Sequence, residues 1–304
     1  ALTNLDDKNG LMMTQNSRAR IYTYALKHLA DFRCKIIENR MEGLQLEIDK
    51  QRVWFRLAGE FNAYNLLAVY GAAVLLNEDP SVVLTSISDA DPVTGRFDTI
   101  KSPDHVSAVI DYAHTPDALM NVLDTLQAIR TGDQKLIAVV GAGGDRDPSK
   151  RPEMGRIAAS KSDRVIFTSD NPRSEDPEEI IRQMLEGVES SQKPKVVVVP
   201  NRKEALKTAS LLAKPGDVIL IAGKGHETYQ EIKGVRYPFN DRQIMEEIFL
   251  TRTMPLKEMM VFTRYELRDK FQTISGVADV RLGGYVDRNL RIWVDKDKLS
   301  LYDL

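Results

Sequence analysis

The chain has 304 residues, 42% of them hydrophobic and 28% charged, with a formal net charge of −2. This composition is typical of a soluble globular protein that is long enough for two or three domains. A charge so close to zero gives no reason to expect nucleic acid or an anionic membrane as a partner. No apolar run approaches the ~18 residues that a membrane span needs, so we expect no membrane insertion.

The single cysteine and the first residues bear on the compartment and on the start of the chain. Cys34 cannot form an internal disulfide, and we expect an ordinary half-buried thiol in a reducing compartment. The opening "ALTNLDDKNG" lacks the basic and apolar parts of a signal peptide. It also lacks an initiator methionine and begins inside a pattern, so we expect the natural sequence to start upstream.

Residues 1–97 combine short strands with two helices. Partly alternating runs predict an antiparallel patch of three strands, at 32–38, 43–49 and 52–59. Two apolar segments predict helices, a long one at 61–76 and a shorter one at 80–90. The apolar side chains expected in the core of the first helix are Phe61, Leu66, Leu67 and Val69. We expect this region to be the end of a larger domain.

Strand-like and helix-like segments alternate regularly between residues 106 and 223. The expected strands are apolar throughout and lie at 106–112, 135–140, 164–169, 195–200 and 217–223. The expected helices lie between them, at 115–129, 152–161, 177–188 and 202–213. Thr115 and Asp176 are expected N-caps, each followed by a proline. The alternation predicts a parallel sheet buried on both faces, in a doubly wound α/β fold.

The pattern changes again after residue 250. A helix is expected over about 257–272, followed by the strand-like runs "GVADVRL" and "NLRIWVD" and a short helix from Lys296. These elements predict a small α+β appendage over residues 251–304.

Polar residues follow four of the five expected strands at their carboxyl ends, the edge at which open α/β sheets bind ligands. The loops read "DYAHTPDAL", "GAGGDRDPSKRP", "DNPRSEDP" and "GKGHE". Loops of this kind are often polar without forming a site. We favour one shared site because six side chains would converge there, those of Arg146, Asn171, Arg173, Lys224, His226 and Glu227.

The stretch "VVGAGGDRDPSKRPEMG", residues 139–155, has the glycines of a phosphate-binding loop but not its chemistry. A Walker A motif continues with lysine and a hydroxyl residue, whereas Asp145, Arg146 and Asp147 follow here. Two carboxylates would repel a triphosphate. An arginine flanked by acids, with the amide, arginine and carboxylate of the neighbouring loops, suits a zwitterion with a second charged end.

A series of motifs occurs in order over about residues 1–250: "GEFNAYNLLA", "GRFD", "DYAHTPDAL", "GAGGDRDPSKRPEMG", "DNPRSEDP", "AGKGHETYQ" and "FNDR". As a set they resemble the Mur ligases, and most of all the members that add meso-diaminopimelate to UDP-MurNAc-L-Ala-D-Glu; "DNPR" is the form associated with diaminopimelate. The resemblance implies a cytoplasmic, ATP-dependent ligase of peptidoglycan synthesis that works through an acyl phosphate. It divides the chain into a partial central domain (1–97), a Rossmann-like C-terminal domain (98–250) and the appendage (251–304).

The resemblance also implies roles for individual residues. Arg146, Asn171 and Arg173 would bind the carboxylates of diaminopimelate, and the backbone of Gly223 with Glu227 would hold its distal amino-acid end. A second set would face the nucleotide from the domain interface: Asn62, Asn65, Arg96, Asp111 and His114. For His114, a structural role in capping its loop is an equally good interpretation.

The chain departs from the family in two ways. No GTNGKT-type P-loop occurs in it, and the Mg²⁺ ligands and carbamylated lysine of the intact family are not found either. We therefore expect no metal site and no ligase activity from this chain on its own; product formed from ATP and diaminopimelate would overturn this. A non-catalytic amino-acid-binding module is the alternative function.

The second departure is the tail, which resembles a periplasmic porter fragment of an RND-type efflux pump in "TISGVADVRLGG" followed by "RIWVDKDKL". A fusion or mosaic reading frame would account for that combination. An ordinary αββα appendage is the alternative.

Overall fold

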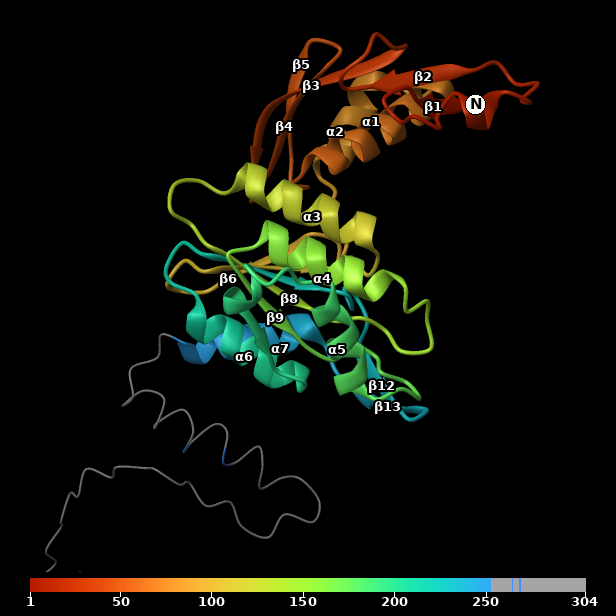
Figure 1. Ribbon diagram of the computed structural model, residues 1–304. Helices are drawn as coiled ribbons and strands as arrows, with labels where there is room; N and C mark the ends of the chain where they lie inside the picture. The colour runs from red at the N-terminus through yellow and green to blue at the C-terminus, as the bar shows by residue number, and fades with distance from the viewer. Residues whose placement is uncertain (253–263, 265–267, 269–304) are drawn as a thin grey trace, which may run out of the picture. The chain divides into compact units, whose positions relative to one another are not determined.

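The structure, a computed structural model, describes residues 1–252 together with 264 and 268. Its main sheet has six strands in the order β10-β9-β8-β11-β7-β6. Figure 1 labels three of them, β6, β8 and β9. The strands are β6 (Asp98–Lys101), β7 (Ser107–Asp111), β8 (Leu136–Val140), β9 (Arg164–Phe167), β10 (Val196–Val198) and β11 (Val218–Ala222). All neighbours pair in parallel except β6, which runs antiparallel to β7. The five predicted strands and the predicted parallel sheet are therefore confirmed, and β6 is an addition.

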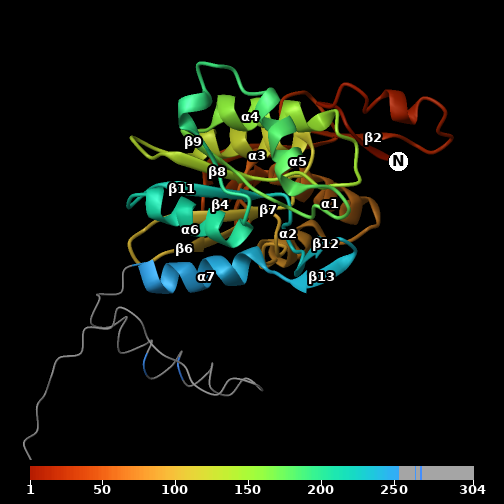
Figure 2. The ribbon, with the colours of Figure 1, turned by 60° about the horizontal axis from the view of Figure 1, so that its bottom comes forward.

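Helices cover both faces of this sheet (Figure 2). One face carries α3 (Pro116–Ile129), α4 (Lys150–Lys161) and α5 (Pro177–Glu186), and the other carries α6 (Arg202–Leu212) and α7 (Asp241–Arg252). Because side chains alternate along a strand, each strand feeds two cores. In β8, for example, Leu136, Ala138 and Val140 face the first core, and Ile137 and Val139 face the second. The doubly wound prediction is confirmed.

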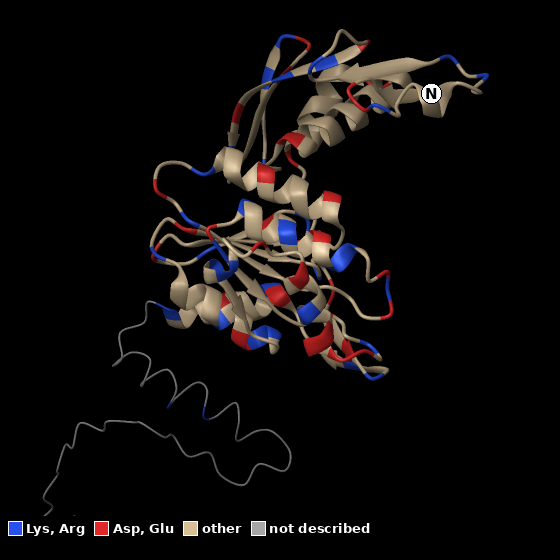
Figure 3. Cartoon of the chain, in the orientation of Figure 1, with Lys and Arg blue, Asp and Glu red and all other residues tan. Residues whose placement is uncertain are grey.

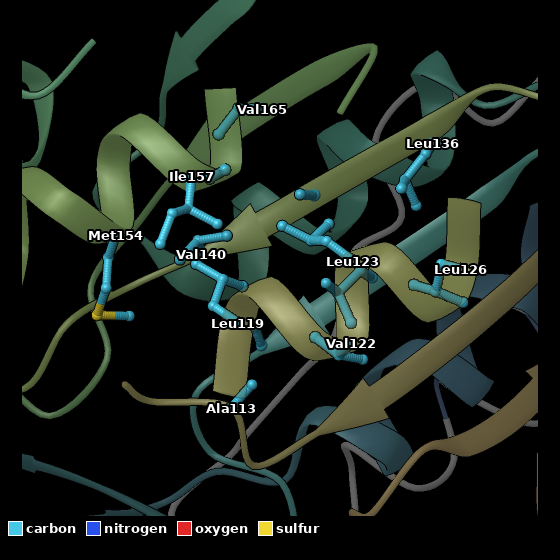
Figure 4. Packing of buried hydrophobic residues seen from close by; sticks show 14 of the residues in the cluster. Ala113, Leu119, Val122, Leu123, Leu126, Leu136, Val140, Met154, Ile157 and Val165 are labelled. Atoms are coloured by element: carbon cyan, nitrogen blue, oxygen red, sulfur yellow. The ribbon is translucent and has the colours of Figure 1, made fainter. Parts of the chain in front are cut away.

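The first core lies between the sheet and the helices α3 to α5. Figure 4 shows Leu119, Leu123 and Leu126 of α3 pointing toward Leu136 and Val140 of β8. The helix begins where the sequence predicts, because the Thr115 hydroxyl accepts a hydrogen bond from the Ala118 amide. The Asp176 side chain caps α5 in the same way, through the Glu178 amide. α4 begins at Lys150, two residues before the predicted Pro152.

α4 and α5 approach closely at two glycines. A Cβ on Gly155 of α4 would lie 1.9 Å from the Met184 carbonyl oxygen, and one on Gly187 would lie 1.7 Å from the Pro152 carbonyl oxygen. Distances this short leave room for no side chain, so the two backbones pack directly against each other.

Gly155→Ala is therefore expected to lower the stability of the chain. Alanine favours a helix by about 1 kcal/mol over glycine, but overpacking of a rigid contact costs about 1–3 kcal/mol. We expect a lower free energy of unfolding in urea denaturation. Ser160→Ala, at an exposed position of the same helix, is the control and should be nearly neutral. An unchanged or raised stability of Gly155→Ala would contradict the close packing.

The N-terminal part of the chain forms a second, mixed sheet in the order β1-β2-β3-β4-β5. Its strands are β1 (Leu2–Asn4), β2 (Tyr22–Ala25), β3 (Phe32–Arg40), β4 (Gly43–Ile48) and β5 (Gln51–Phe55). The predicted antiparallel patch is confirmed as β3 to β5, whereas β1 and β2 pair in parallel and were not predicted. The sheet packs on α1 (Glu60–Leu75), and α2 (Pro80–Ser88) packs on α1 and near β5.

Side chains of this N-terminal core differ from expectation at two positions. Val69 was predicted to be core but is 53% exposed, whereas Leu66 and Leu67 are buried. Cys34 is fully rather than half buried, and burial raises the pKa of its thiol to about 12. An unreactive structural thiol is the consequence.

Two further elements complete the described chain. A hairpin of β12 (Tyr229–Ile232) and β13 (Val235–Pro238) precedes α7. Neither the hairpin nor α7 was predicted. Short 3₁₀ turns occur at Met12–Thr14 and Lys193–Lys195. No helix in the described part of the chain is long and apolar enough to cross a membrane. Lys and Arg are interspersed with Asp and Glu over these elements (Figure 3). The predicted appendage lies outside the described residues except at 251, 252, 264 and 268.

Candidate functional site

The structure brings three of the predicted loops into direct contact at the carboxyl edge of the main sheet. They are the glycine loop after β8 (141–149), the loop after β9 (168–176) and the loop after β11 (223–228). The strands β9, β8 and β11 are consecutive in the sheet, so their carboxyl ends lie side by side. The fourth loop, after β7, meets the last of the three at a neighbouring position.

Two backbone amides of the glycine loop donate hydrogen bonds to the loop after β9. The Gly144 amide donates to the Asn171 carbonyl oxygen at 2.8 Å, and the Asp145 amide donates to the Glu175 carboxylate at 2.5 Å. A Cβ on Gly144 would lie 1.9 Å from the Pro172 carbonyl oxygen. These two amides of the loop are thus occupied within the protein, which is unlike the open amide nest that holds a phosphate.

Arg151, which the sequence did not single out, holds the same two loops together. It is 1% exposed and binds both carboxylate oxygens of Glu175 at 2.8 Å, the Gln183 side chain at 2.7 Å and the Gly143 carbonyl oxygen at 3.1 Å. The hydrogen bond from Arg151 lowers the pKa of Glu175. The sequence signal that could have identified Arg151 was its position directly before Pro152, in the first turn of α4. From there its side chain reaches back to the glycine loop.

A buried polar cluster lies at the junction of the loops after β9 and β11. The Lys224 ammonium is completely buried and donates to Asn171 Oδ1 at 2.9 Å, Glu227 Oε2 at 3.2 Å and Asp170 Oδ1 at 3.4 Å. Asn171 Nδ2 donates to the same Glu227 oxygen at 2.8 Å, and the Glu231 amide donates to Asn171 Oδ1 at 2.9 Å. Two carboxylates against one ammonium leave the cluster with one net negative charge.

The hairpin β12–β13 fixes Arg173 through its backbone. The Arg173 amide donates to the Glu231 carbonyl oxygen at 3.0 Å, and the Lys233 amide donates to the Arg173 carbonyl oxygen at 2.6 Å. Arg173 has a φ of 50°, in the left-handed region that side chains rarely adopt. Its guanidinium donates to the Gly144 carbonyl oxygen at 2.7 Å, so it lies beside the glycine loop.

The other two residues predicted for the amino acid differ in character. Arg146 is exposed, and no residue in the described part of the chain forms an ion pair with its guanidinium. Gly223 has a φ of 116°, and a Cβ there would lie 2.7 Å from Asp170 Oδ2, so only glycine fits. Its amide already donates to the Asp111 carbonyl oxygen, which leaves its carbonyl group for a ligand.

Three of the residues predicted for the nucleotide lie around Tyr112. The Arg96 guanidinium lies 4.6 Å from the centre of the Tyr112 ring, and the His114 ring is 4.5 Å from it in an edge-on arrangement. Asp111 connects the segments around Tyr112, because its carboxylate accepts hydrogen bonds from the amides of Phe97 and Ala113, each at 2.8 Å. Burial raises the pKa of Asp111 against these hydrogen bonds.

His114 forms a hydrogen bond within its own loop, and its ring is exposed. Its Nδ1 is 2.8 Å from the Tyr112 carbonyl oxygen, which fits the expected capping role. The exposed His226 of the "GKGHE" loop also lies near Tyr112, with 5.3 Å between the centres of the two rings. Close contact between Gly95 and Gly225 brings the "GRFD" loop against this loop.

The two asparagines of α1 are not brought to this group directly. Asn62 is 8% exposed and donates to the Ala58 carbonyl oxygen at 2.7 Å, and its Oδ1 accepts from Asn65 at 3.2 Å. The neighbouring Phe61 makes an edge-on contact with Phe97, at 5.9 Å between ring centres. Asn62 therefore serves its own helix, and Asn65 is exposed beside it.

A second buried ion pair lies beneath the site and was not predicted. Arg202, at the start of α6, binds both carboxylate oxygens of Asp241, at the start of α7, at 2.8 Å each. Both side chains are 0% exposed. Arg202 also donates to the carbonyl oxygen of Ala222, the last residue of β11, at 3.0 Å. Asp241 belongs to the "FNDR" motif, which contributes to the family resemblance. No role was predicted for this aspartate from the sequence.

The fold and these motifs define the class of the domain. Residues 95–225 match the family model of the Mur ligase glutamate ligase domain, so the chain carries a Mur ligase C-terminal domain with a Rossmann-like α/β fold. It is similar to the UDP-N-acetylmuramoyl-L-alanyl-D-glutamate–2,6-diaminopimelate ligase of Bacteroides thetaiotaomicron, with 55% identity over 82% of this chain and 52% of that relative. The enzyme of the same name from Cytophaga hutchinsonii is 54% identical over 83% of this chain and 51% of its own length.

Solved structures agree with this similarity. A UDP-N-acetylmuramoyl-L-alanyl-D-glutamate–2,6-diaminopimelate ligase matches with a TM-score of 0.58 and 36% identity, over 83% of this chain and 53% of that one. MurF from Acinetobacter baumannii has a TM-score of 0.60 at 15% identity, over 82% of this chain and 51% of its own, which shows a shared fold. The chain spans about half the length of the curated relatives it matches.

Proposed function

We propose that this chain forms the amino-acid-binding part of a cytoplasmic, ATP-dependent ligase that adds meso-diaminopimelate to UDP-MurNAc-L-Ala-D-Glu in peptidoglycan synthesis. The observation that carries the proposal is the buried cluster of Lys224, Asn171 and Glu227 beside Arg173. Relatives whose names state this reaction are 53–55% identical to the chain over the same region.

The charges of the site match those of the amino acid. Arg173 lies beside the glycine loop, and Arg146 is exposed on that loop. Two guanidinium groups and the Asn171 amide can receive carboxylates, since arginine binds a carboxylate through two parallel hydrogen bonds. Glu227 Oε1 has no partner among the described residues and can receive an ammonium, with the Gly223 carbonyl as a second acceptor. Diaminopimelate has both kinds of group at both of its ends.

For the nucleotide, we propose that Arg96, Asp111 and His114, together with Asn62 and Asn65, form the side of the site that faces ATP. The Tyr112 ring, which contacts both Arg96 and His114, supports this, because aromatic and cationic groups suit the face of a purine. Within the described residues, no group of three or more His, Cys, Asp or Glu side chains could hold a metal ion. We therefore assign no residue of this chain to the Mg²⁺ that the resemblance implies.

Calorimetric titration of the full 304-residue chain with meso-diaminopimelate and with L-lysine tests the proposal. We expect diaminopimelate to bind at least tenfold more tightly, because L-lysine lacks the distal carboxylate and leaves an arginine unpaired. UDP-MurNAc-L-Ala-D-Glu and ATP can be titrated in the same way. Equal binding of the two amino acids, or binding of neither by the folded chain, would refute the proposed substrate.

A non-catalytic amino-acid-binding module is the second candidate, and the lack of a P-loop in these 304 residues favours it. Incubation of the purified chain with ATP and both substrates tests this candidate, because product formed by the chain on its own would exclude a non-catalytic module. The resemblance of the tail to an RND porter stays a prediction and supports neither candidate.

A further inference from the structure

Lys224 is the most completely buried charged group of the amino-acid site, at 0% exposure. Its ammonium has three acceptors, on Asp170, Asn171 and Glu227, and its side chain is enclosed beside the Tyr229 ring at 5.7 Å. An ammonium without exposure cannot itself meet a ligand in solvent. Any effect it has on binding must pass through the groups that it holds.

The hydrogen bonds fix the orientation of the Asn171 amide and of the Glu227 carboxylate. Asn171 Oδ1 accepts from Lys224 and from the Glu231 amide, so the amide group is oriented with Nδ2 toward Glu227. Glu227 Oε2 then accepts from both Asn171 and Lys224 and is saturated. Its other oxygen, Oε1, is left without a partner among the described residues, on a side chain that is 18% exposed.

We infer that Lys224 is a positioning residue that fixes the Asn171 amide and turns one oxygen of Glu227 toward the distal ammonium of the amino acid. This inference rests on the proposed function. Without Lys224, two carboxylates at the junction would lack their common cation, and Glu227 would turn toward solvent. Asn171 would lose the donor that sets its orientation. The site would then lose its discrimination for an ammonium more than its affinity for carboxylates.

The test compares two ligands on the full 304-residue chain by calorimetry. Meso-diaminopimelate carries the distal ammonium, and L-2-aminopimelate has the same carbon chain and carboxylates without it. We expect the unaltered chain to bind diaminopimelate about 10- to 100-fold more tightly, the effect of one charge-assisted hydrogen bond. In Lys224→Met this ratio should fall toward one, and in Lys224→Gln it should fall part of the way.

Two further variants separate positioning from general loss of structure. Lys207→Met removes an exposed lysine paired with Glu204 and should keep the full ratio. In Glu227→Gln the ratio should already be low, and adding Lys224→Met should lower it no further, because both act through one carboxylate. If Lys224→Met alone fails to fold, Lys224→Gln keeps a hydrogen-bond donor at this position and carries the test. Circular dichroism and thermal unfolding show which variants are folded.

The outcomes separate this inference from the proposed function. If the unaltered chain discriminates between the ligands and folded Lys224→Met keeps the same ratio, the positioning role is refuted and the proposed function stands. A uniform loss of affinity for both ligands in Lys224→Met and Lys224→Gln would likewise refute it. Failure of the unaltered chain to bind diaminopimelate would overturn both.

Discussion

Asp241→Ala is expected to lower the free energy of unfolding by about 3–5 kcal/mol, because it leaves the Arg202 guanidinium buried without a counter-charge. Burial opposes the charged form of Arg202, but the Asp241 carboxylate outweighs it and raises the pKa of Arg202. The arginine therefore stays charged, and its only route to solvation is local opening of α6 and α7. Urea denaturation of the full chain, followed by circular dichroism, measures the loss.

Two comparisons make this result specific. Glu204→Ala breaks an exposed ion pair with Lys207 and should cost less than about 1 kcal/mol. The double variant Arg202→Met with Asp241→Leu removes both buried charges and should recover much of the lost stability. If Asp241→Ala were as mild as Glu204→Ala, the buried pair would not have the energetic role that its geometry indicates.

Arg173→Ala is expected to weaken binding of meso-diaminopimelate by about 100-fold, since a bidentate arginine–carboxylate contact combines two charge-assisted hydrogen bonds. Arg173→Lys keeps the charge but loses the planar pair of donors, and about a tenfold loss is expected. Calorimetric titration measures both variants against the unaltered chain.

Arg182→Ala is the matched control for Arg173. This arginine is exposed on α5 and paired with Glu179 and Glu186, so its removal should leave the affinity unchanged. Retention of full affinity by folded Arg173→Ala would contradict the assignment of this residue to the amino acid. An equal loss in both variants would indicate a nonspecific effect of charge.

The main sheet could be predicted from sequence because its strands are apolar on both faces and its helices carry N-caps. Thr115 and Asp176 begin α3 and α5 as predicted, since capping is a local interaction of a few neighbouring residues. β1, β2 and the hairpin were missed because they are short and depend on partners distant in sequence. β1, for example, has three residues and pairs with β2, about twenty residues later. Val69 was misjudged because an apolar side chain can stay exposed.

The site was predictable only in part, and for a physical reason. Asn171, Glu227 and Lys224 could be grouped in advance because they follow two parallel strands, β9 and β11, whose carboxyl ends lie at the same edge of the sheet. The bidentate partners Arg151 and Glu175 could not, because nothing local in the sequence shows which of many charged side chains turns inward. For Asn62 the sequence did not show that its side chain donates to the Ala58 carbonyl oxygen beside its own helix, and its role toward the nucleotide stays a prediction.

The direct contact of Gly144 with the Pro172 carbonyl has a consequence for redesign of this domain. The path of residues 170–173 is fixed on one side by the glycine loop and on the other by the backbone of the hairpin at Glu231 and Lys233. A loop exchanged alone, to accept a different amino acid, would meet backbone on both sides. Three segments, separated by tens of residues in the sequence, therefore have to be exchanged together: the glycine loop, residues 170–173 and the hairpin.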